Sequence, residues 1–158
     1  MENKVQIVGK NQGKQLKIAG GNYRIIVSGD DTDRQYSIIE MNVPPGGGPN
    51  PHRHQGFEET FFVLEGEVEF SSEDGKSTAT VGDLIRIPLN GGAHCFKNKS
   101  DKPAKLLCTV VPSGLDEFFE KADQAAKDEP ENMAARMKEL SETYGQQLLP
   151  PDYFDTAK

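Results

Sequence analysis

The sequence predicts a mainly β fold, a sandwich or barrel of short strands, followed by two α-helices. Segments rich in β-branched and aromatic residues recur along most of the chain, and Gly, Asn and Asp punctuate them. After Pro112 the apolar residues recur at helical spacing instead. A chain of 158 residues suits one domain with a substantial core. We therefore expect a β unit over residues 1–112 and a helical extension over residues 113–158 that packs on it.

The expected strands follow one another with short turns between them, and we expect about eight to eleven in total. A loop of four prolines, three glycines and one asparagine, Pro44–Pro51, cannot enter a helix or a central strand and delivers His52 to the next strand. The other strands are predicted at Tyr23–Val27, Tyr36–Val43, Glu59–Leu64, Glu67–Ser71, Ser77–Val81, Leu84–Ile87, His94–Lys97 and Ala104–Val111.

The first helix is predicted to begin after Ser113 as its N-cap, and the second near Pro130, with Gly145 as its C-terminal stop. Their apolar stripes are Leu115, Phe118, Phe119 and Ala122, then Met133, Met137, Leu140 and Tyr144. The methionine-bearing stripe favours core or interface packing over a ligand pocket. The tail from Leu148 to Lys158 is expected to be loosely ordered.

Composition narrows the classes of partner. The net charge of −7 and the absence of a Lys/Arg run argue against nucleic acid and against an anionic membrane surface. No apolar run reaches transmembrane length and no signal-peptide pattern opens the sequence, so we expect a cytoplasmic protein. Cys95 and Cys108 are expected to stay reduced and to pack as small apolar side chains.

The three histidines of the chain, His52, His54 and His94, fall where a metal ion would need them. His52 and His54 are two residues apart, which places both imidazoles on one face of a strand. Glu59 follows five residues later, and His94 arrives on a different strand. Three imidazoles and one carboxylate suit one divalent transition metal, namely Fe, Mn, Ni, Cu or Zn, whose identity stays open.

These residues carry a resemblance to the cupin superfamily. The run Gly46-x5-His52-x-His54-x4-Glu59-x6-Gly66 is similar to the first cupin motif, and Gly82-x5-Pro88 with His94-x3-Asn98 to the second. The second motif departs from the pattern, because Asn90 replaces a glycine and the stretch from Pro88 to His94 is one residue longer. The resemblance covers about residues 23–112 and looks like the small single-domain cupins labelled quercetin dioxygenase-like. It implies one jelly-roll barrel, a double-stranded β-helix, around a metal.

Glu58 competes with Glu59 for the role of ligand. Strand parity places Glu59 with Phe61 and Val63 on one face, which suits an apolar barrel interior, so Glu58 would face outward. The spacing to Gly66 also selects Glu59. Arg53, between the two inward histidines, should face outward as well, whereas the sequence leaves the direction of Arg86 open.

The metal site permits several functions. The first is a dioxygenase-type oxidoreductase acting on a small apolar or aromatic enolisable substrate, with Phe61, Val63 and Phe96 lining the pocket. In it the resemblance to flavonol dioxygenases implies that Glu59 also accepts the substrate proton. The alternatives are a non-redox metalloenzyme, such as an isomerase or decarboxylase, and a sensor or storage module without catalysis. An inward Arg86 would favour a carboxylate substrate and the decarboxylase.

A homodimer is also expected. The segment Phe61–Leu64 is apolar on both strand faces, so one face fills the barrel while the other needs a cover. That cover is either a second subunit or the C-terminal helices.

Overall fold

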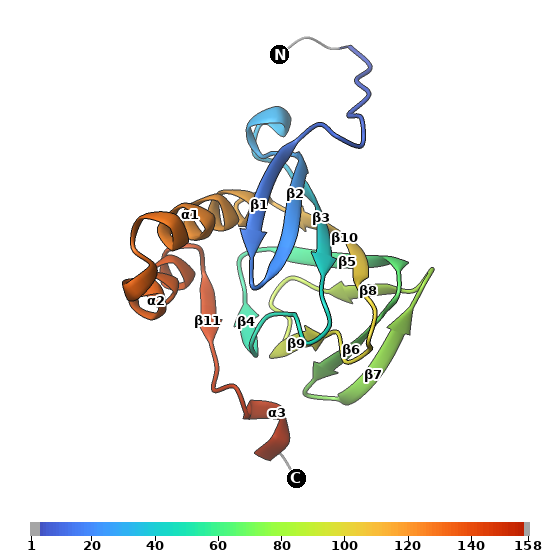
Figure 1. Cartoon of the computed structure of the whole chain (residues 1–158), viewed down its shortest axis with the longest axis vertical. Coiled ribbons are helices and arrows are strands. Elements are labelled where there is room, and N and C mark those ends of the chain that lie inside the picture. The colour runs from blue at the N-terminus through green and yellow to red at the C-terminus, as the bar shows by residue number, and fades with distance from the viewer. Residues whose placement is uncertain (1–3, 157–158) are drawn as a thin grey trace.

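Two antiparallel β-sheets face each other across the core of the protein, and two longer helices pack at one side (Figure 1). The structure, a computed structural model, describes residues 4–156; residues 1–3 and 157–158, at the outer ends of the two predicted segments, lie outside it. Eleven strands are present in the described part of the chain, within the range that the sequence predicts. The fold is the mainly β jelly roll that we expected.

The two sheets contain six and five strands. In order across the larger sheet these are β1 (Lys14–Ile18), β2 (Gly21–Val27), β3 (Ser37–Val43), β10 (Ala104–Val111), β5 (Glu58–Glu65) and β8 (Leu84–Ile87). Across the smaller sheet they are β11 (Gln146–Leu148), β4 (His52–His54), β9 (His94–Lys97), β6 (Glu67–Ser72) and β7 (Gly75–Thr80).

Alternation along the strands builds the core. In β3 and β10 every second residue is buried, so one face of each strand turns inward. The residues that meet between the sheets are almost all apolar, and removing them from water is the main driving force for this arrangement. The most enclosed of these side chains are Ile39, Met41, Val43, Val63, Val68, Leu106, Cys108 and Val110.

All the predicted strands are present, with ends that differ by at most two residues from those in the structure. Two strands were missed. β1 is largely polar and buries only Leu16 fully, and β11 consists of three residues, Gln146–Leu148. Neither carries the apolar alternation by which strands are predicted from sequence.

The C-terminal extension contains α1 (Leu115–Asp128), the 3₁₀ turn η2 (Pro130–Asn132), α2 (Met133–Thr143) and the short α3 (Tyr153–Thr156). Gly145 follows α2 with φ of 73°, as its predicted role as a stop requires. The expectation of a loosely ordered tail is wrong for Leu148, which pairs with His52 in the smaller sheet.

The prediction of Ser113 as the N-cap of the first helix is also wrong. Gly114 occupies that position, and no side chain caps the helix there. Instead the buried carboxylate of Asp116 accepts hydrogen bonds from the backbone N–H of Gly114 at 3.0 Å and of Gly29 at 2.8 Å. Gly29 directly precedes the 3₁₀ turn η1 (Asp30–Thr32). Asp116 therefore ties the start of α1 to the loop between β2 and β3.

The helices cover one end of the larger sheet and leave its outer face at β5 open. α1 packs against β1 and β3, and α2 packs against α1 and β11. Phe62 and Leu84, paired across β5 and β8, are 38% and 58% exposed. The C-terminal helices are therefore not the cover for the outward residues of β5. Within residues 4–156, no helix has both the length and the apolar character needed to cross a bilayer.

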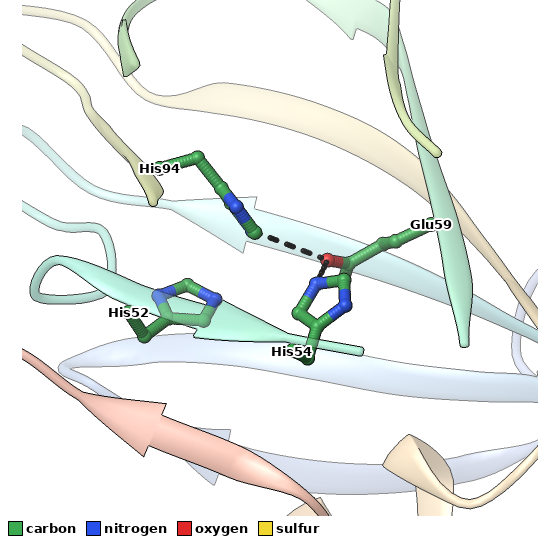
Figure 2. A group of neighbouring side chains, drawn as sticks. All are labelled: His52, His54, Glu59 and His94. Atoms are coloured by element: carbon green, nitrogen blue, oxygen red, sulfur yellow. Dashed lines mark hydrogen bonds and ion pairs between the residues drawn. The ribbon is translucent and has the colours of Figure 1, made fainter. Parts of the chain in front are cut away.

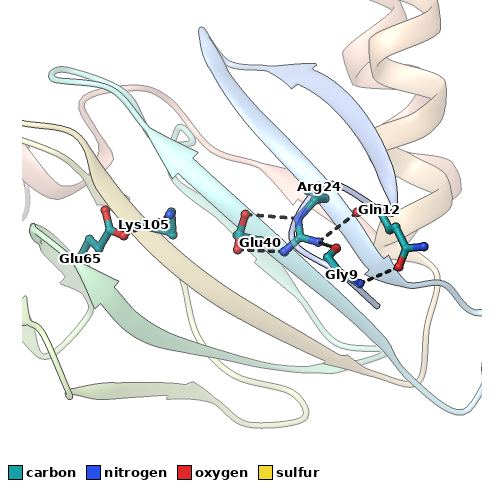
Figure 3. A network of polar contacts seen from close by, with 6 residues as sticks. All are labelled: Gly9, Gln12, Arg24, Glu40, Glu65 and Lys105. Carbon is teal, nitrogen blue, oxygen red and sulfur yellow. Dashed lines mark hydrogen bonds and ion pairs between the residues drawn. The ribbon is translucent and has the colours of Figure 1, made fainter. Parts of the chain in front are cut away.

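A buried arginine fixes the N-terminal segment to the outside of the larger sheet (Figure 3). Arg24 on β2 donates to the carbonyls of Gly9 at 3.2 Å and Gln12 at 3.0 Å, and to both carboxylate oxygens of Glu40 on β3. The bidentate pair with Glu40 holds the guanidinium in one orientation. The segment before β1 is thereby held by hydrogen bonds from the Arg24 side chain to its backbone carbonyls, and not by pairing with a neighbouring strand.

Candidate metal centre

The four predicted ligands come from three strands in two sheets and meet at one point (Figure 2). His52 and His54 project from the same face of β4, and His94 on β9 is the direct cross-strand neighbour of His52. Glu59 reaches the same point from β5 in the opposite sheet. The two sheets must pack face to face before this group exists.

All four side chains are buried, and one ligand atom of each lies within 4.8 Å of the others. The Glu59 carboxylate is 3.1 Å from Nε2 of His54 and 3.8 Å from Nε2 of His94. The His52 and His94 rings are edge to face with centroids 4.5 Å apart. The cluster is thus compact enough for a single ion.

Backbone carbonyls set the orientation of every imidazole. Nδ1 of His52 lies 2.9 Å from the Asn50 carbonyl, and Nδ1 of His94 lies 2.9 Å from that of Gly92. Nδ1 of His54 lies 3.2 Å from the Phe57 carbonyl. A carbonyl only accepts hydrogen bonds, so each Nδ1 carries a proton and Nε2 is the ring atom that faces the centre. This is the usual way in which proteins orient histidine ligands.

Burial shapes the charges in the cluster. Desolvation on its own raises the pKa of Glu59, but the hydrogen bond with His54 and the nearby imidazoles of His94 and His52 outweigh it and hold the pKa at about 2. Desolvation, followed by repulsion from His94, lowers the pKa of His52 to about 4. Near neutral pH the centre therefore contains a carboxylate and at least one neutral imidazole, both competent as metal ligands.

The donor set fits a divalent transition metal. Three Nε2 atoms and a carboxylate converge on one point, and a cation is a group that all four can bind at once when the Nε2 atoms carry no proton. Within the described residues, Nε2 of His94 has no hydrogen-bond partner although it is fully buried. Nitrogen and oxygen ligands of this kind suit Fe, Mn, Ni, Cu or Zn.

The turn before β9 explains how His94 reaches the centre despite the longer second motif. Asn90 adopts φ of 59°, in the left-handed region that asparagine tolerates, and the Gly91 N–H donates to the Pro88 carbonyl at 2.8 Å. The extra residue is absorbed within this turn. β9 therefore begins at His94 with the ring facing inward.

The neighbouring charged residues face away from the centre. Glu58 accepts two hydrogen bonds of 2.8 Å from Arg86, whose side chain is exposed. The direction of Arg86, which the sequence left open, is therefore outward. Arg53, expected to face outward, donates to the Tyr153 hydroxyl of α3 at 3.2 Å.

A cavity of about 290 Å³ adjoins the cluster and separates the barrel from the helices. His52, Glu59 and His94 contribute to its wall, and so do Phe61 and Phe96 of the predicted pocket. Val63, also predicted for the pocket, lies instead in the core. The opposite wall comes from the extension and consists of Leu115, Phe118, Phe119, Ala122, Met137, Ser141, Gln146 and Leu148. Met137 therefore lines a pocket, a role that the helical spacing alone did not favour.

Two residues near the cluster were not anticipated from the sequence. The Cys108 thiol, buried in β10, donates to Oε1 of Glu59 at 3.4 Å. Burial first, and then the charge of Glu59, keep the pKa of this thiol well above its usual value, so it remains a donor. Tyr23 on β2 contributes its ring to the cavity wall. A core position on an ordinary strand carries no sequence signal for such contacts.

Comparison with known proteins agrees with this geometry. A family model described as a cupin domain matches residues 39–110. The chain is 25% identical over 113 residues to quercetin 2,3-dioxygenase of Bacillus subtilis, an alignment that covers 72% of this chain and 33% of that protein. The chain spans between 33% and 60% of the length of the curated relatives it matches.

Solved structures show the same fold. A predicted oxalate decarboxylase from Thermotoga maritima aligns with a TM-score of 0.62 at 20% identity, covering 68% of this chain and 99% of that chain. A polyketide cyclase from Streptomyces resistomycificus aligns with a TM-score of 0.61 at 22% identity, covering 70% of this chain and 81% of that one. At these identities the likeness concerns the fold alone.

Proposed function

We propose that this chain, which matches the cupin domain over residues 39–110, is a metal-dependent oxidoreductase of the dioxygenase type. The observation that carries the proposal is the group of three Nε2 atoms and one carboxylate beside an apolar cavity. The similarity of the chain's sequence to that of a quercetin 2,3-dioxygenase supports the same reaction class. The substrate class is a small apolar or aromatic compound that can enolise.

The residues of the chain account for binding and orientation. A divalent ion held by His52, His54, Glu59 and His94 would supply Lewis acidity and, for a redox metal, electron transfer. Four protein ligands would leave such an ion able to bind small molecules as well. Phe61 and Phe96 provide an apolar wall beside the cluster and keep bulk water away.

Glu59 has the position of a proton acceptor. Its carboxylate lies in the cavity wall and is deprotonated at neutral pH. A substrate hydroxyl bound beside it would lose its proton toward this oxygen. Cys108 holds the other carboxylate oxygen of Glu59, which leaves Oε2 directed at the imidazoles.

No observation favours a carboxylate or phosphate substrate over a neutral one. Arg86 is exposed and paired with Glu58. Among the described residues that line the cavity, none is Lys or Arg. An inward Arg86 would have given weight to the decarboxylase alternative, and its outward direction gives none.

Oxygen uptake tests the proposal. The protein is loaded separately with iron, manganese, nickel and copper, and oxygen consumption is followed with flavonols and with simple diketones. We expect uptake with at least one metal, and none from a His54→Ala control treated in the same way. No uptake with any metal, together with anaerobic turnover of a carboxylate or sugar, would overturn the oxygenase and leave the metal site in place.

A further inference from the structure

The cavity wall formed by the C-terminal extension contains two polar atoms without hydrogen-bond partners in the described residues. The Ser141 hydroxyl on α2 and Nε2 of Gln146 on β11 are buried, and neither makes a hydrogen bond to any residue in 4–156. Ser141 is 1% exposed and Gln146 is 9% exposed, and both line the cavity. Buried polar groups are nearly always satisfied, because an unpaired one costs the free energy of its lost hydration. Two unpaired polar groups in one cavity wall therefore indicate a place where a bound molecule would make hydrogen bonds.

The register of β11 directs Gln146 toward the metal centre. Gln146 lies opposite His54 in the antiparallel pair β11–β4, so their side chains project from the same face of the sheet. In Figure 2, β11 runs alongside β4, beside the two histidines. The next residue, Gln147, projects from the other face and is exposed. The amide of Gln146 therefore belongs to the same cavity as the ligand cluster.

Aromatic and thioether groups make up much of the remaining wall of the cavity. Phe61 and Phe96 line the barrel side, and Phe118, Phe119 and Met137 line the helical side. A ligand in the cavity therefore meets polar atoms at the cluster and at Gln146 and Ser141, and apolar groups elsewhere. Because no described lining residue is Lys or Arg, a ligand atom at Gln146 and Ser141 meets no positive charge from a lysine or arginine. A neutral oxygen suits that place better than a carboxylate.

We propose that Gln146 and Ser141 form a second anchoring subsite, which selects small, uncharged aromatic ligands with a second oxygen in addition to the one at the metal centre. One oxygen is placed at His52, His54, Glu59 and His94, and the other, a carbonyl or hydroxyl oxygen, accepts a hydrogen bond from Nε2 of Gln146. This inference rests on the metal site of the proposed function but not on its oxygen chemistry. It assigns ligand selection to the extension, which lies outside the cupin match at 39–110.

A matched pair of catechols tests the subsite. 4-Acetylcatechol carries a carbonyl oxygen away from the catechol head, and 4-isopropylcatechol has nearly the same shape without it. Their dissociation constants are measured by calorimetry on the full-length, zinc-loaded protein, since zinc carries out no redox chemistry. The ratio of the two constants is then compared between the wild type and the variants Gln146→Met and Ser141→Ala. Intrinsic differences in chelation cancel in that comparison.

We expect Gln146→Met to weaken binding of the acetyl compound about three- to tenfold relative to the isopropyl compound, the range for one net hydrogen bond. Ser141→Ala should act in the same direction. Gln147→Met, on the exposed face of the same strand, is the control and should leave the ratio unchanged. Zinc content and melting temperature verify that each variant is folded and loaded.

An unchanged ratio in both variants, or a failure of the zinc-loaded protein to bind either catechol, would overturn the subsite. A different result would count against the dioxygenase proposal. A zinc-loaded protein with the expected preference that consumes no oxygen with any redox metal would support the subsite and count against the oxygenase.

Discussion

Each histidine of the cluster makes two separate contacts, and both are needed for a metal site. Nδ1 donates to a carbonyl two or three residues away, which requires only local chain geometry. Nε2 points to a centre shared with a strand of the other sheet. The local bond removes rotational freedom from the ring before any metal arrives, so less entropy is lost on binding.

Removal of His54 should abolish most metal binding. His54 is the most enclosed imidazole of the cluster and the one in closest contact with Glu59. We expect His54→Ala to lose bound metal and to melt at a lower temperature in metal-supplied buffer, because binding at 100 times Kd adds about 2.7 kcal/mol to native stability. Metal analysis and thermal denaturation with and without chelator measure both effects. Unchanged metal content would place the site elsewhere.

Substitution of the two adjacent glutamates, Glu58 and Glu59, should have very different effects on metal content. Glu59→Gln replaces a charged ligand by a neutral amide and should reduce metal content strongly. Glu58→Gln affects only a solvent-screened pair with Arg86 and should leave the metal content and the stability nearly unchanged. Metal stoichiometry after dialysis compares them. A larger loss for Glu58→Gln would show that the strand register is wrong.

Cys108 should act through Glu59. Its thiol holds Oε1 of that carboxylate, and loss of a partner that orients a ligand typically weakens metal affinity about 10- to 100-fold. We expect this loss for Cys108→Ala in a competition titration with a chromophoric chelator. Cys95→Ala is the matched control, since Cys95 is also buried but lies outside the core cluster that contains Cys108. Equal metal affinities in the two variants would contradict a role of Cys108 in positioning Glu59.

At the scale of elements, the three-residue strand β4 depends on its neighbours. It is held between β9 and β11, and the pairing with β11 sets His52 opposite Leu148 and His54 opposite Gln146. Strands of this length have little stability alone. Close backbone approach helps, because Gly48, just before β4, lies where a Cβ would come within 2.1 Å of the Phe96 carbonyl. The loop before β4 therefore docks directly on β9.

Arg24 should stabilise the N-terminal segment more than an exposed pair on the same sheet. Removing one partner of the enclosed Arg24–Glu40 pair leaves a carboxylate and two carbonyls short of donors. We expect Arg24→Leu to cost about 2–3 kcal/mol in denaturant unfolding. Lys105→Leu, which breaks the more exposed pair with Glu65 in Figure 3, should cost less than about 1 kcal/mol. An equal loss of unfolding free energy in the two variants would argue against a role of Arg24 in holding the N-terminal segment on the sheet.

At the scale of the whole molecule, the outer face of β5 and β8 remains open, and a homodimer stays our expectation. Phe62 and Leu84 form an exposed apolar pair there. Light scattering at micromolar concentration should give twice the 17.4 kDa of one chain. Phe62→Ser should shift the mass toward one chain, whereas Leu89→Ser, at another exposed apolar position, should not. A wild-type mass of one chain would contradict the dimer.

The sequence alone determined nine of the eleven described strands, the fold class and the four candidate ligands. These depend on local properties: alternation along a strand, glycine and proline in turns, and the spacing of His52, His54 and Glu59 within one stretch of chain. The tolerance of Asn90 for a left-handed turn is likewise a property of the residue itself.

Only the tertiary structure decided the second wall of the cavity. Cys108, Ser141 and Gln146 are ordinary residues on their own elements, and their contacts come from packing between segments far apart in the chain. The strand β11 exists because β4 offers it an unpaired edge, since its own three residues carry little β signal. The candidate metal ligands can therefore be identified from the sequence, whereas the residues proposed to select a substrate are brought together only by the packing of the extension against the barrel.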